Sequence, residues 1–387
     1  MVKFTEEFVE FWLETKNGQQ PFPVFTHFCP SFDKFLAMKL IELEAGRGFI
    51  IKNCERGIDG HILLAHGTNN FNPNVDFESC TKTVGIKSES TYLAERLGVE
   101  QNPKYQYLLH FAKFREKTSY YYSETDVFSL INTLYRIYGC SVETITLAKD
   151  FAFCAIEAKI LDCETFDFSV ERIYAVIKKC RPQLAEWWWQ IAQAIISARS
   201  ILRESAKEES SHPVCLERVT TPNKSIMKLA CFQSDNPELS RQAIAKGYDI
   251  VITKSTAGFI SIASNKISSD EARDIVRVLR YEEDKDQKQN WKILESFAGN
   301  PPDECWYFHP NSNNISNGIF INPKTKPTKL SLEKVAELTW IVLSGMFEQQ
   351  NEPECQRGLC PSSAKNPCEL YPWGLYRCRK NRRKTGF

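Results

Sequence analysis

The chain has 387 residues, of which 42% are hydrophobic and 25% are charged, with a formal net charge of +1. A chain of this length and composition can bury a large core and is expected to form two domains and a tail. The near-zero net charge excludes a strong overall field toward nucleic acid, membranes or acidic substrates, so any electrostatic partner must meet a local patch.

The N-terminal sequence predicts a cytoplasmic protein. Residues 1–18 are acidic and amphipathic, and they lack the apolar core behind a basic start that a signal peptide carries. No stretch reaches the roughly 18 apolar residues that a membrane-spanning helix needs. We therefore expect a cytoplasmic location and no membrane partner.

Residues 1–122 are predicted to form an α/β domain with a mainly parallel sheet. Short apolar runs at PVFTHF, GFIIKN and HILLAH indicate strands. Amphipathic patterns at 33–46, ending at a glycine, and at 87–98 indicate helices. Strands that alternate with helices favour a parallel sheet with flanking helices.

Residues 123–208 are predicted to form a helical segment. Helical patterns cover 124–139, 141–161, 168–180 and 183–209, and the third stops before Pro182. The last pattern contains Trp187, Trp188 and Trp189, which cannot share one helix face. Either this helix is buried on two sides, or one of the tryptophans contacts a protein partner.

Residues 213–347 are predicted to form a second, smaller α/β domain after the polar stretch 207–213. Strands are expected at 228–235, 249–255 and 258–264, and a helix capped by Ser268 or Ser269 should follow. Residues 306–321 then read as two strands around a polar turn, and 330–347 as a closing helix.

Three segments resemble the DHH phosphoesterase superfamily. HFCPSFD, residues 27–33, resembles the first motif of that family, His-x-x-Pro-Asp-x-Asp at a strand-to-helix turn. ILLAHGTN, residues 62–69, lies where the family has a strand running into its Asp-His-His signature. Residues 228–266 and the helix after them resemble the family's second domain, and this likeness implies substrate contacts at Thr256, Ala257 and Gly258.

The resemblance implies a two-metal centre, usually with manganese, in which carboxylates offset the charge of the ions. This chain departs from that pattern. Ser31 and Ala65 stand where the motifs would carry Asp, and Gly67 stands where the signature would carry its second His. Arg115 and Glu116 lie where the later Asp is expected. We therefore expect a degenerate catalytic centre.

The remaining candidate ligands contain a single carboxylate, because only His27, Asp33 and His66 keep the family's pattern. One ion could bind there weakly, or the two histidines could be strand-end residues that bond to the backbone. Asp59 and His61 could also join Asp33 and His66 in a rearranged, active centre. That alternative has Asp33 and His66 as catalytic residues and predicts manganese-dependent hydrolysis that Asp33→Ala abolishes.

The cysteines divide into two groups. The ten from Cys29 to Cys305 are scattered singly and are expected to be small buried hydrophobes. The other four crowd into the tail, residues 348–387, where thiolates could hold zinc or an iron–sulfur cluster. Unliganded thiols or disulfides are the alternatives, and a reducing cytosol disfavours disulfides. These four are Cys355, Cys360, Cys368 and Cys378.

The tail also combines aromatic and basic residues, the composition of a nucleic-acid contact. Tyr371, Trp373 and Tyr376 could stack on bases, and the cations after them could contact phosphates; a solvated basic terminus is the alternative. The cations are Arg377, Arg379, Lys380, Arg382, Arg383 and Lys384.

Three functions are compatible with this sequence. The first is a catalytically degenerate DHH-like subunit that binds DNA, RNA or a nucleotide and carries a metal-stabilised basic tail. The second is an active metal-dependent phosphoesterase or nuclease with rearranged ligands. The third is a protein-interaction or regulatory subunit without nucleic acid, which contacts its partner through the helical segment.

Overall fold

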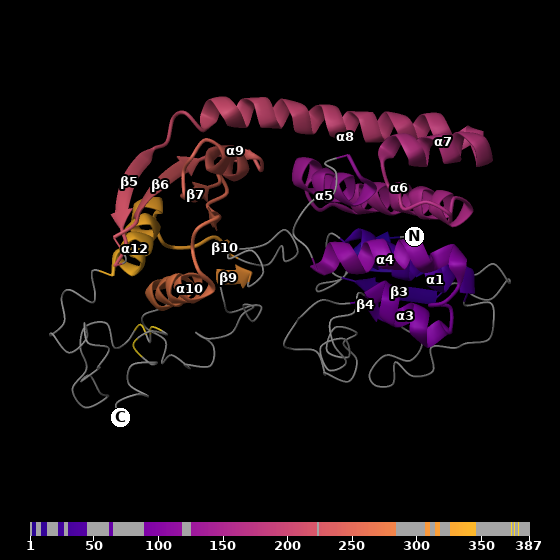
Figure 1. Cartoon of the computed structure of the whole chain (residues 1–387), viewed down its shortest axis with the longest axis horizontal. Helices are drawn as coiled ribbons and strands as arrows, with labels where there is room; N and C mark the ends of the chain where they lie inside the picture. The colour runs from indigo at the N-terminus through magenta and orange to yellow at the C-terminus, as the bar shows by residue number, and fades with distance from the viewer. Residues whose placement is uncertain are drawn as a thin grey trace, which may run out of the picture. The chain divides into compact units, whose positions relative to one another are not determined.

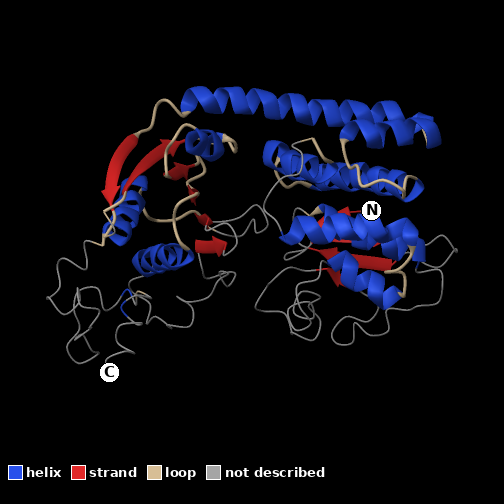
Figure 2. Cartoon of the chain, in the orientation of Figure 1, coloured by secondary structure: helices blue, strands red, loops and turns tan. Residues whose placement is uncertain are grey.

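The structure is a computed structural model in which the chain forms two compact units. Unit 1 comprises residues 1–201 with 320–322, and unit 2 comprises residues 202–319 with 323–387. Both units combine helices with a sheet, which confirms the α/β class (Figures 1 and 2). The structure describes residues 2–4, 9–13, 22–26, 30–44, 62–64, 89–117, 125–222, 224–283, 306–309, 314–317, 326–345, 373, 375 and 378.

The sheet of unit 1 is mixed, which differs from the mainly parallel sheet expected there. Its described strands run in the order β1 (Val2–Phe4), β2 (Val9–Leu13), β3 (Phe22–Thr26) and β4 (Ile62–Leu64). The first two pairings are antiparallel, and only β3 and β4 pair in parallel. Helix α1 (Phe32–Glu44) lies between β3 and β4 in the chain, as the crossover between parallel strands requires.

Helix α6 is central to the packing of unit 1, where it contacts α1, α4, α5 and α7. Asp126, Ser141 and Ser169 cap the N-termini of α5, α6 and α7 by accepting backbone N–H bonds. Helix α8 begins at Pro182 and extends into unit 2. The helices after α1 are α3 (Glu89–Leu97), α4 (Pro103–Lys117), α5 (Val127–Tyr138), α6 (Val142–Leu161), α7 (Val170–Cys180) and α8 (Pro182–Glu209).

The three tryptophans of α8 are accounted for by burial on two sides of the helix. The Trp188 ring is fully buried and stacks on Phe151 of α6, with centroids 4.6 Å apart. Its indole N–H donates to the Phe151 carbonyl oxygen at 3.0 Å. Trp189 packs on Tyr174 of α7, and Trp187 lies half-buried against the same core. The alternative of a protein partner at this helix therefore gains no support here.

Unit 2 contains a six-stranded mixed sheet with the order β5-β6-β7-β8-β10-β9. Only β6 and β7 pair in parallel; the other described pairings are antiparallel. Helix α9 (Leu239–Ala245) lies between the two parallel strands in the chain. The strands are β5 (Cys215–Thr220), β6 (Ile226–Gln233), β7 (Ile250–Lys254), β8 (Ile260–Ser264), β9 (Trp306–His309) and β10 (Asn314–Asn317).

Two separate cores cover the two faces of this sheet. On one face, α10 (Ser269–Glu283) and α12 (Leu332–Ser344) bury the larger core, to which β6 contributes Leu229 and Cys231. On the other face, α9 and the last turns of α8 cover Ala230 and Phe232. Successive residues of β6 thus enter different cores, as the period of a strand requires.

Most elements expected from periodicity are present among the described residues, including the paired strands β9 and β10 and the closing helix α12. Ser268 caps α10 in a capping box: its hydroxyl accepts from the Glu271 N–H, and the Glu271 carboxylate accepts from the Ser268 N–H. The strand expected at 48–53 lies outside the described residues. In the part of the chain that is described, no helix has both the length and the apolar character needed to cross a membrane.

We predict that Trp188→Ala lowers the free energy of unfolding by about 3 to 5 kcal/mol, since it removes a fully buried ring and leaves a cavity. Trp189→Ala is the matched control on the same helix and should cost no more than about 2 kcal/mol, because its ring is only half-buried. Urea denaturation followed by circular dichroism measures both losses. Equal losses would contradict the described packing.

Candidate functional site

The first two DHH-like motifs follow neighbouring strands of unit 1. In the parallel pairing of β3 and β4, Thr26 lies opposite Leu64, so both strands end at the same edge of the sheet. This topology is the one that a site built at the carboxyl ends of parallel strands requires. His27, Asp59, His61 and His66 lie outside the described residues, so Asp33 is the one predicted ligand of this centre whose contacts can be given.

The Asp33 carboxylate joins two helices. It is buried in the first turn of α1 and accepts a hydrogen bond from the Ser90 hydroxyl and one from the Ser90 backbone N–H at 3.3 Å. Ser90 lies in the first turn of α3, where backbone N–H groups lack partners within the helix. A carboxylate placed there is also favoured by the positive end of the helix dipole. These contacts give Asp33 a structural role that requires no metal.

We predict that Asp33→Ala, in metal-free buffer, lowers the free energy of unfolding by about 1 to 3 kcal/mol, because both Ser90 donors lose their acceptor. Asp33→Asn keeps one side-chain oxygen and should lose less. Thermal and urea denaturation of both variants check this. A stability difference that appears only when manganese is present would instead assign Asp33 to a metal site.

The positions at which the sequence departs from the family pattern are partly described. Ser31 is half-buried, and its carbonyl oxygen accepts from the Phe35 N–H at 3.1 Å, so this residue directly precedes α1 and accepts its first backbone hydrogen bond. Arg115 and Glu116 lie in the last turns of α4, but their side chains are outside the described part. No group of three or more His, Cys, Asp or Glu residues arranged to hold a metal ion occurs among the described side chains.

The turn between β7 and β8, with Thr256 and Gly258, is fixed by its own contacts. The Thr256 N–H and hydroxyl both donate to the Asp235 carboxylate, at 2.8 Å and 2.6 Å. These bonds lower the pKa of Asp235. Gly258 has a φ of 89°, and a Cβ there would lie 3.1 Å from the Pro327 Cβ. The glycine is therefore required by the backbone, and a substrate contact at this turn remains a prediction.

The described residues of the tail pack on unit 2. Trp373 and Cys378 lie half-buried against the core of α10 and α12, and Leu375 is fully buried in it. Part of the Trp373 ring is thus used in folding. The tail residues that lie outside the described part are Cys355, Cys360, Cys368, Tyr371, Tyr376, Arg377, Arg379, Lys380, Arg382, Arg383 and Lys384.

The cysteines upstream of the tail were expected to be buried, and among the described ones this is correct only for Cys231. Burial raises the pKa of its thiol to about 12. Cys180 is exposed, and Cys140 is disulfide-bonded, which a reducing cytosol does not predict. Three others are half-buried: Cys154, Cys163 and Cys215. Burial also raises the pKa of the half-buried Cys154 to about 11, so a reactive thiolate is not favoured at Cys154 or Cys231.

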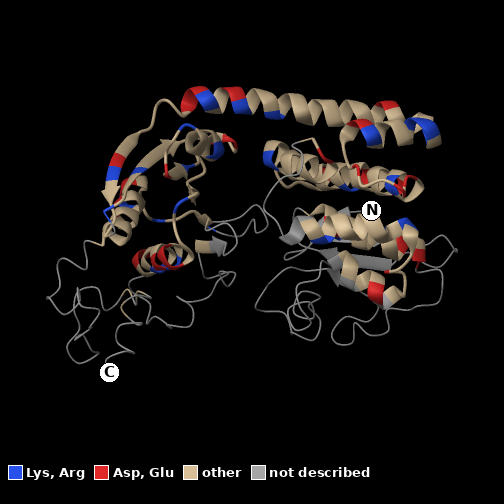
Figure 3. Cartoon of the chain, viewed as in Figure 1, with Lys and Arg blue, Asp and Glu red and all other residues tan. Residues whose placement is uncertain are grey.

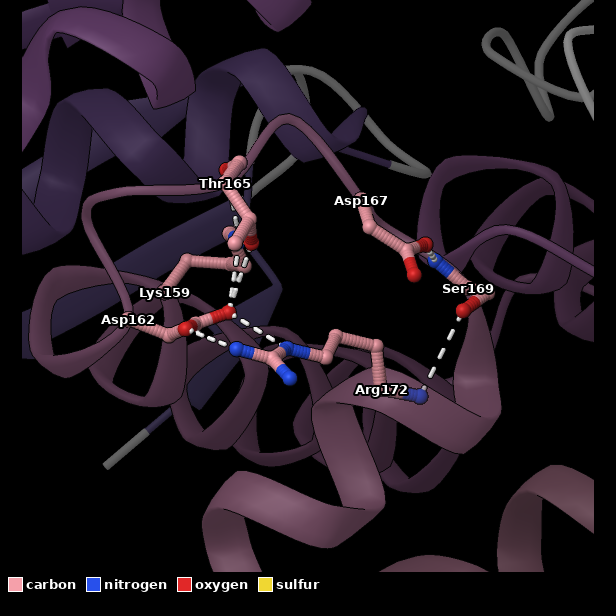
Figure 4. A network of polar contacts seen from close by, with 6 residues as sticks. All are labelled: Lys159, Asp162, Thr165, Asp167, Ser169 and Arg172. Atoms are coloured by element: carbon pink, nitrogen blue, oxygen red, sulfur yellow. Dashed lines mark hydrogen bonds and ion pairs between the residues drawn. The ribbon is translucent and has the colours of Figure 1, made fainter.

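A buried lysine in unit 1 belongs to a structural network (Figure 4). The Lys159 ammonium donates to the Asp162 carboxylate at 3.1 Å and to the Thr165 carbonyl and hydroxyl oxygens. Arg172 donates to both carboxylate oxygens of Asp162, and this contact holds the pKa of Asp162 well below its usual range. Burial lowers the pKa of Lys159. Each ammonium proton of Lys159 thus has an acceptor. Because these acceptors belong to Asp162 and Thr165, the network fixes the segment that joins α6 to α7.

We predict that Asp162→Asn lowers the free energy of unfolding by about 2 kcal/mol at neutral pH, because the buried Lys159 loses its counter-charge. The folded pKa of Asp162 is depressed, so this stabilisation is present above its unfolded pKa of about 3.9 and is lost as the pH falls. Asp167→Asn, an exposed carboxylate of the same network, is the control and should change stability by less than about 0.5 kcal/mol. Urea denaturation across the pH range tests both; a pH-independent difference would contradict the assignment.

Strands β5 and β6 place two cations side by side. Arg218 lies opposite Lys228, and the Thr221 N–H donates to the Ser225 carbonyl oxygen at 2.9 Å. Hydrogen-bonded and non-hydrogen-bonded residue pairs alternate along an antiparallel ladder, and Thr221 and Ser225 form a hydrogen-bonded pair. Arg218 and Lys228, three positions along each strand, are therefore a non-hydrogen-bonded pair, the kind whose side chains lie closest together. Both side chains are exposed, and neither forms an ion pair with any described residue. Like charges in this position repel each other.

The surroundings of this pair contain further cationic and apolar groups. Lys224 is exposed in the turn of the hairpin, and Leu216 and Ile226 are 57% and 61% exposed on the same face as the pair. The nearby carboxylate of Asp249 already accepts from Lys266 at 2.7 Å and from the Lys228 backbone N–H. We call Arg218, Lys224 and Lys228 the cationic hairpin; the Lys and Arg positions of β5 and β6 are blue in Figure 3.

Sequence reasoning missed the cationic hairpin, because its charges are distributed over two strands. β5 was not expected, and without its register the nine residues between Arg218 and Lys228 give no sign that the two side chains lie close together. The signal that could have found it is the run of alternating residues on both sides of the turn TPNKS, residues 221–225.

Comparison with protein-family models, curated proteins and solved structures found no match to this chain. The likeness to the DHH superfamily therefore rests on the sequence motifs.

Proposed function

We propose that this chain is a nucleic-acid-binding subunit on a DHH-like scaffold whose catalytic centre is degenerate. The observation that carries the proposal is the cationic hairpin: two exposed cations that form no ion pair with any described residue are held opposite each other by strand register. A phosphate bound between them would relieve their repulsion and release counterions from the nucleic acid.

The edge position of β5 favours contact through side chains over the addition of a partner strand. The side chain of Trp340 on α12 reaches this edge, where its indole N–H donates to the Arg218 carbonyl oxygen at 3.3 Å. That carbonyl is one of the groups that an added strand would need. The exposed side chains of Arg218 and Lys228 remain accessible to phosphates.

The proposal that the centre is inactive is supported by the missing metal ligands in the sequence and by the hydrogen bonds of Asp33. Three positions of the first two family motifs lack their metal ligand, and the one remaining motif carboxylate already accepts two hydrogen bonds from Ser90. Two divalent ions at such a centre would lack bridging anions. An active phosphoesterase would have to recruit Asp59 and His61.

The basic tail belongs to the same proposal. Its aromatic and cationic residues would extend the phosphate contacts, and zinc or an iron–sulfur cluster at the four tail cysteines would stabilise it. The described tail residues pack on unit 2, the unit that carries the cationic hairpin. DNA, RNA and a nucleotide remain the candidate ligands, and a cytoplasmic location remains part of the prediction.

We predict that the double variant Arg218→Gln, Lys228→Gln binds a labelled single-stranded oligonucleotide about tenfold more weakly at low salt, because two phosphate contacts are lost. The slope of log K against log salt should fall by about 1.4, which is about 0.7 for each contact with a single strand. Fluorescence anisotropy with DNA and RNA forms of the same oligonucleotide measures both quantities.

The control removes two exposed cations from unit 1, with the variant Lys178→Gln, Lys179→Gln. It changes the net charge by the same amount and should leave the affinity within about twofold, since long-range effects are screened beyond roughly 10 Å. An equal loss in both double variants would show nonspecific attraction. No binding by the unmodified chain would contradict the proposed function itself.

A further inference from the structure

Two cysteines of unit 2 lie directly opposite each other in the sheet. Cys215 at the start of β5 and Cys231 in β6 are register partners in the antiparallel pairing, although residues 216–230 separate them in the sequence. Register partners project from the same face of a sheet, and here both thiols meet the core under α10 and α12. None of the motifs identified in the sequence contains either cysteine.

The backbone already meets the geometric requirement for a disulfide. Directly opposite residues of an antiparallel pair have Cα atoms about 4.5 to 5.5 Å apart, and disulfides join Cα atoms about 4.4 to 6.8 Å apart. The two thiols also form a hydrogen bond with each other, so their side chains are turned toward each other. Both cysteines are free in the structure. A bond between their sulfurs therefore needs rotation of the side chains and no change of register.

The two thiols differ in their access to solvent. Cys215 is half-buried, whereas Cys231 is fully buried. The Cys215 thiol also donates to the Glu217 carboxylate at 3.7 Å, on the same face of the strand. A dissolved oxidant can therefore reach Cys215 directly, and it can react with Cys231 only through Cys215.

Both thiols are protonated at neutral pH. Burial raises the pKa of Cys231 to about 12, and burial together with the Glu217 carboxylate raises the pKa of Cys215. Exchange with an external disulfide is therefore slow, because the thiolate is the attacking species. The reduced pair also lacks the thiolate stabilisation that makes the disulfides of strongly oxidising dithiol proteins easy to reduce, so the bond should persist once formed.

Two other uses of the pair have less support. A tetrahedral metal needs further ligands, and the described residues contain no group of three or more His, Cys, Asp or Glu side chains arranged to hold one. Packing as a small hydrophobe explains Cys231 but not the alignment of a second, half-buried thiol with it. Disulfide chemistry does occur in this chain, since Cys140 is disulfide-bonded.

We propose that Cys215 and Cys231 form a reversible disulfide across β5 and β6 by exchange with a small disulfide such as glutathione disulfide. The Cys215 thiolate attacks one sulfur of glutathione disulfide, which breaks that bond, releases one glutathione thiolate and leaves Cys215 in a mixed disulfide. The Cys231 thiolate then attacks the Cys215 sulfur and displaces the second glutathione thiolate. The two cysteine protons end on the released glutathiones, so the pair is oxidised by two electrons and glutathione disulfide is reduced.

This disulfide would fasten an edge strand. Among the described strands β5 pairs with β6 alone, and α12 packs against it. Such a strand opens more readily than a central one, and a covalent link to β6 opposes that opening. The link also fixes the register that holds Arg218 opposite Lys228. The inference does not depend on the proposed nucleic-acid binding, since the thiols lie on the other face of the two strands.

Peptide mapping of the full chain, first reduced and then equilibrated with glutathione disulfide and glutathione, tests the proposal. Trypsin, used without reduction, leaves Cys215 in residues 208–218 and Cys231 in residues 229–241, each with no other cysteine. Mass spectrometry should find these peptides joined by a disulfide, at least about tenfold more abundantly than after the same treatment in urea. Recovery of both cysteines as free thiols, or of Cys215 stably bound to glutathione, would overturn the proposal.

Single variants separate the roles of the two thiols. Cys231→Ala should hold Cys215 as a mixed disulfide with glutathione, as is expected of the exposed Cys180, which serves as the internal control. Cys215→Ala should leave Cys231 unmodified, because no oxidant reaches it. Modification of Cys231 in that variant as fast as that of Cys180 would contradict the assigned order of attack.

A second measurement on the unmodified chain tests the effect on the strand. Oxidation should slow hydrogen–deuterium exchange of the β5 amides at least about fivefold, because the covalent link limits opening of the edge. The amides of α6 in unit 1 are the control and should exchange at the same rate in both redox states. Unchanged exchange in β5 after the linked peptide has formed would overturn the claim that the disulfide fastens this strand.

Discussion

The alternation of side chains along β6 is the constraint on which the architecture of unit 2 depends. Because successive residues point to opposite faces, Leu229 and Cys231 enter the core under α10 and α12, while Ala230 and Phe232 enter the core under α8 and α9. Lys228 occupies the second face as well, beyond the helices that cover it. A shift of one residue in register would turn this lysine toward the core under α10 and α12 and exchange the residues of the two cores, so the hydrophobic pattern specifies the register strongly.

The same face of the sheet carries two regions of opposite charge. At the hairpin, register holds Arg218 against Lys228, and neither cation forms an ion pair with a described residue. At the other end of β5, the C-terminus of α8 carries two carboxylates, Glu208 and Glu209. The cationic arrangement is unfavourable in the free protein and becomes favourable when an anion binds, whereas Glu209 is stabilised by hydrogen bonds from Ser205, Ser234 and Asn236. The near-zero net charge of the chain hides both regions, because they cancel in the sum.

Sequence reasoning succeeded where a single local signal decided the outcome. Periodicity and capping residues identified most helices, including α10 with Ser268 at its N-cap. It failed where signals were short or nonlocal. Helix α4 was overlooked although Asn102 and Pro103 form a start signal, with the Asn102 side chain accepting from the Lys104 N–H. The pairing of β1 and β2 is local, with Phe4 opposite Val9, but both strands are short. The contact of Asp33 with Ser90 joins residues 57 positions apart, and the cationic hairpin depends on the register of two strands, so a single sequence reveals neither.

Hydrogen–deuterium exchange of the full chain, with and without a saturating single-stranded oligonucleotide, tests the central claim most directly. Binding at the cationic hairpin should slow amide exchange in residues 214–231, because phosphates and bases would cover the hairpin and reduce its opening. The control region is the network around Asp162 in unit 1, where exchange should be unchanged. Protection confined to unit 1, or none in 214–231 at saturation, would contradict the assignment of nucleic-acid binding to this hairpin.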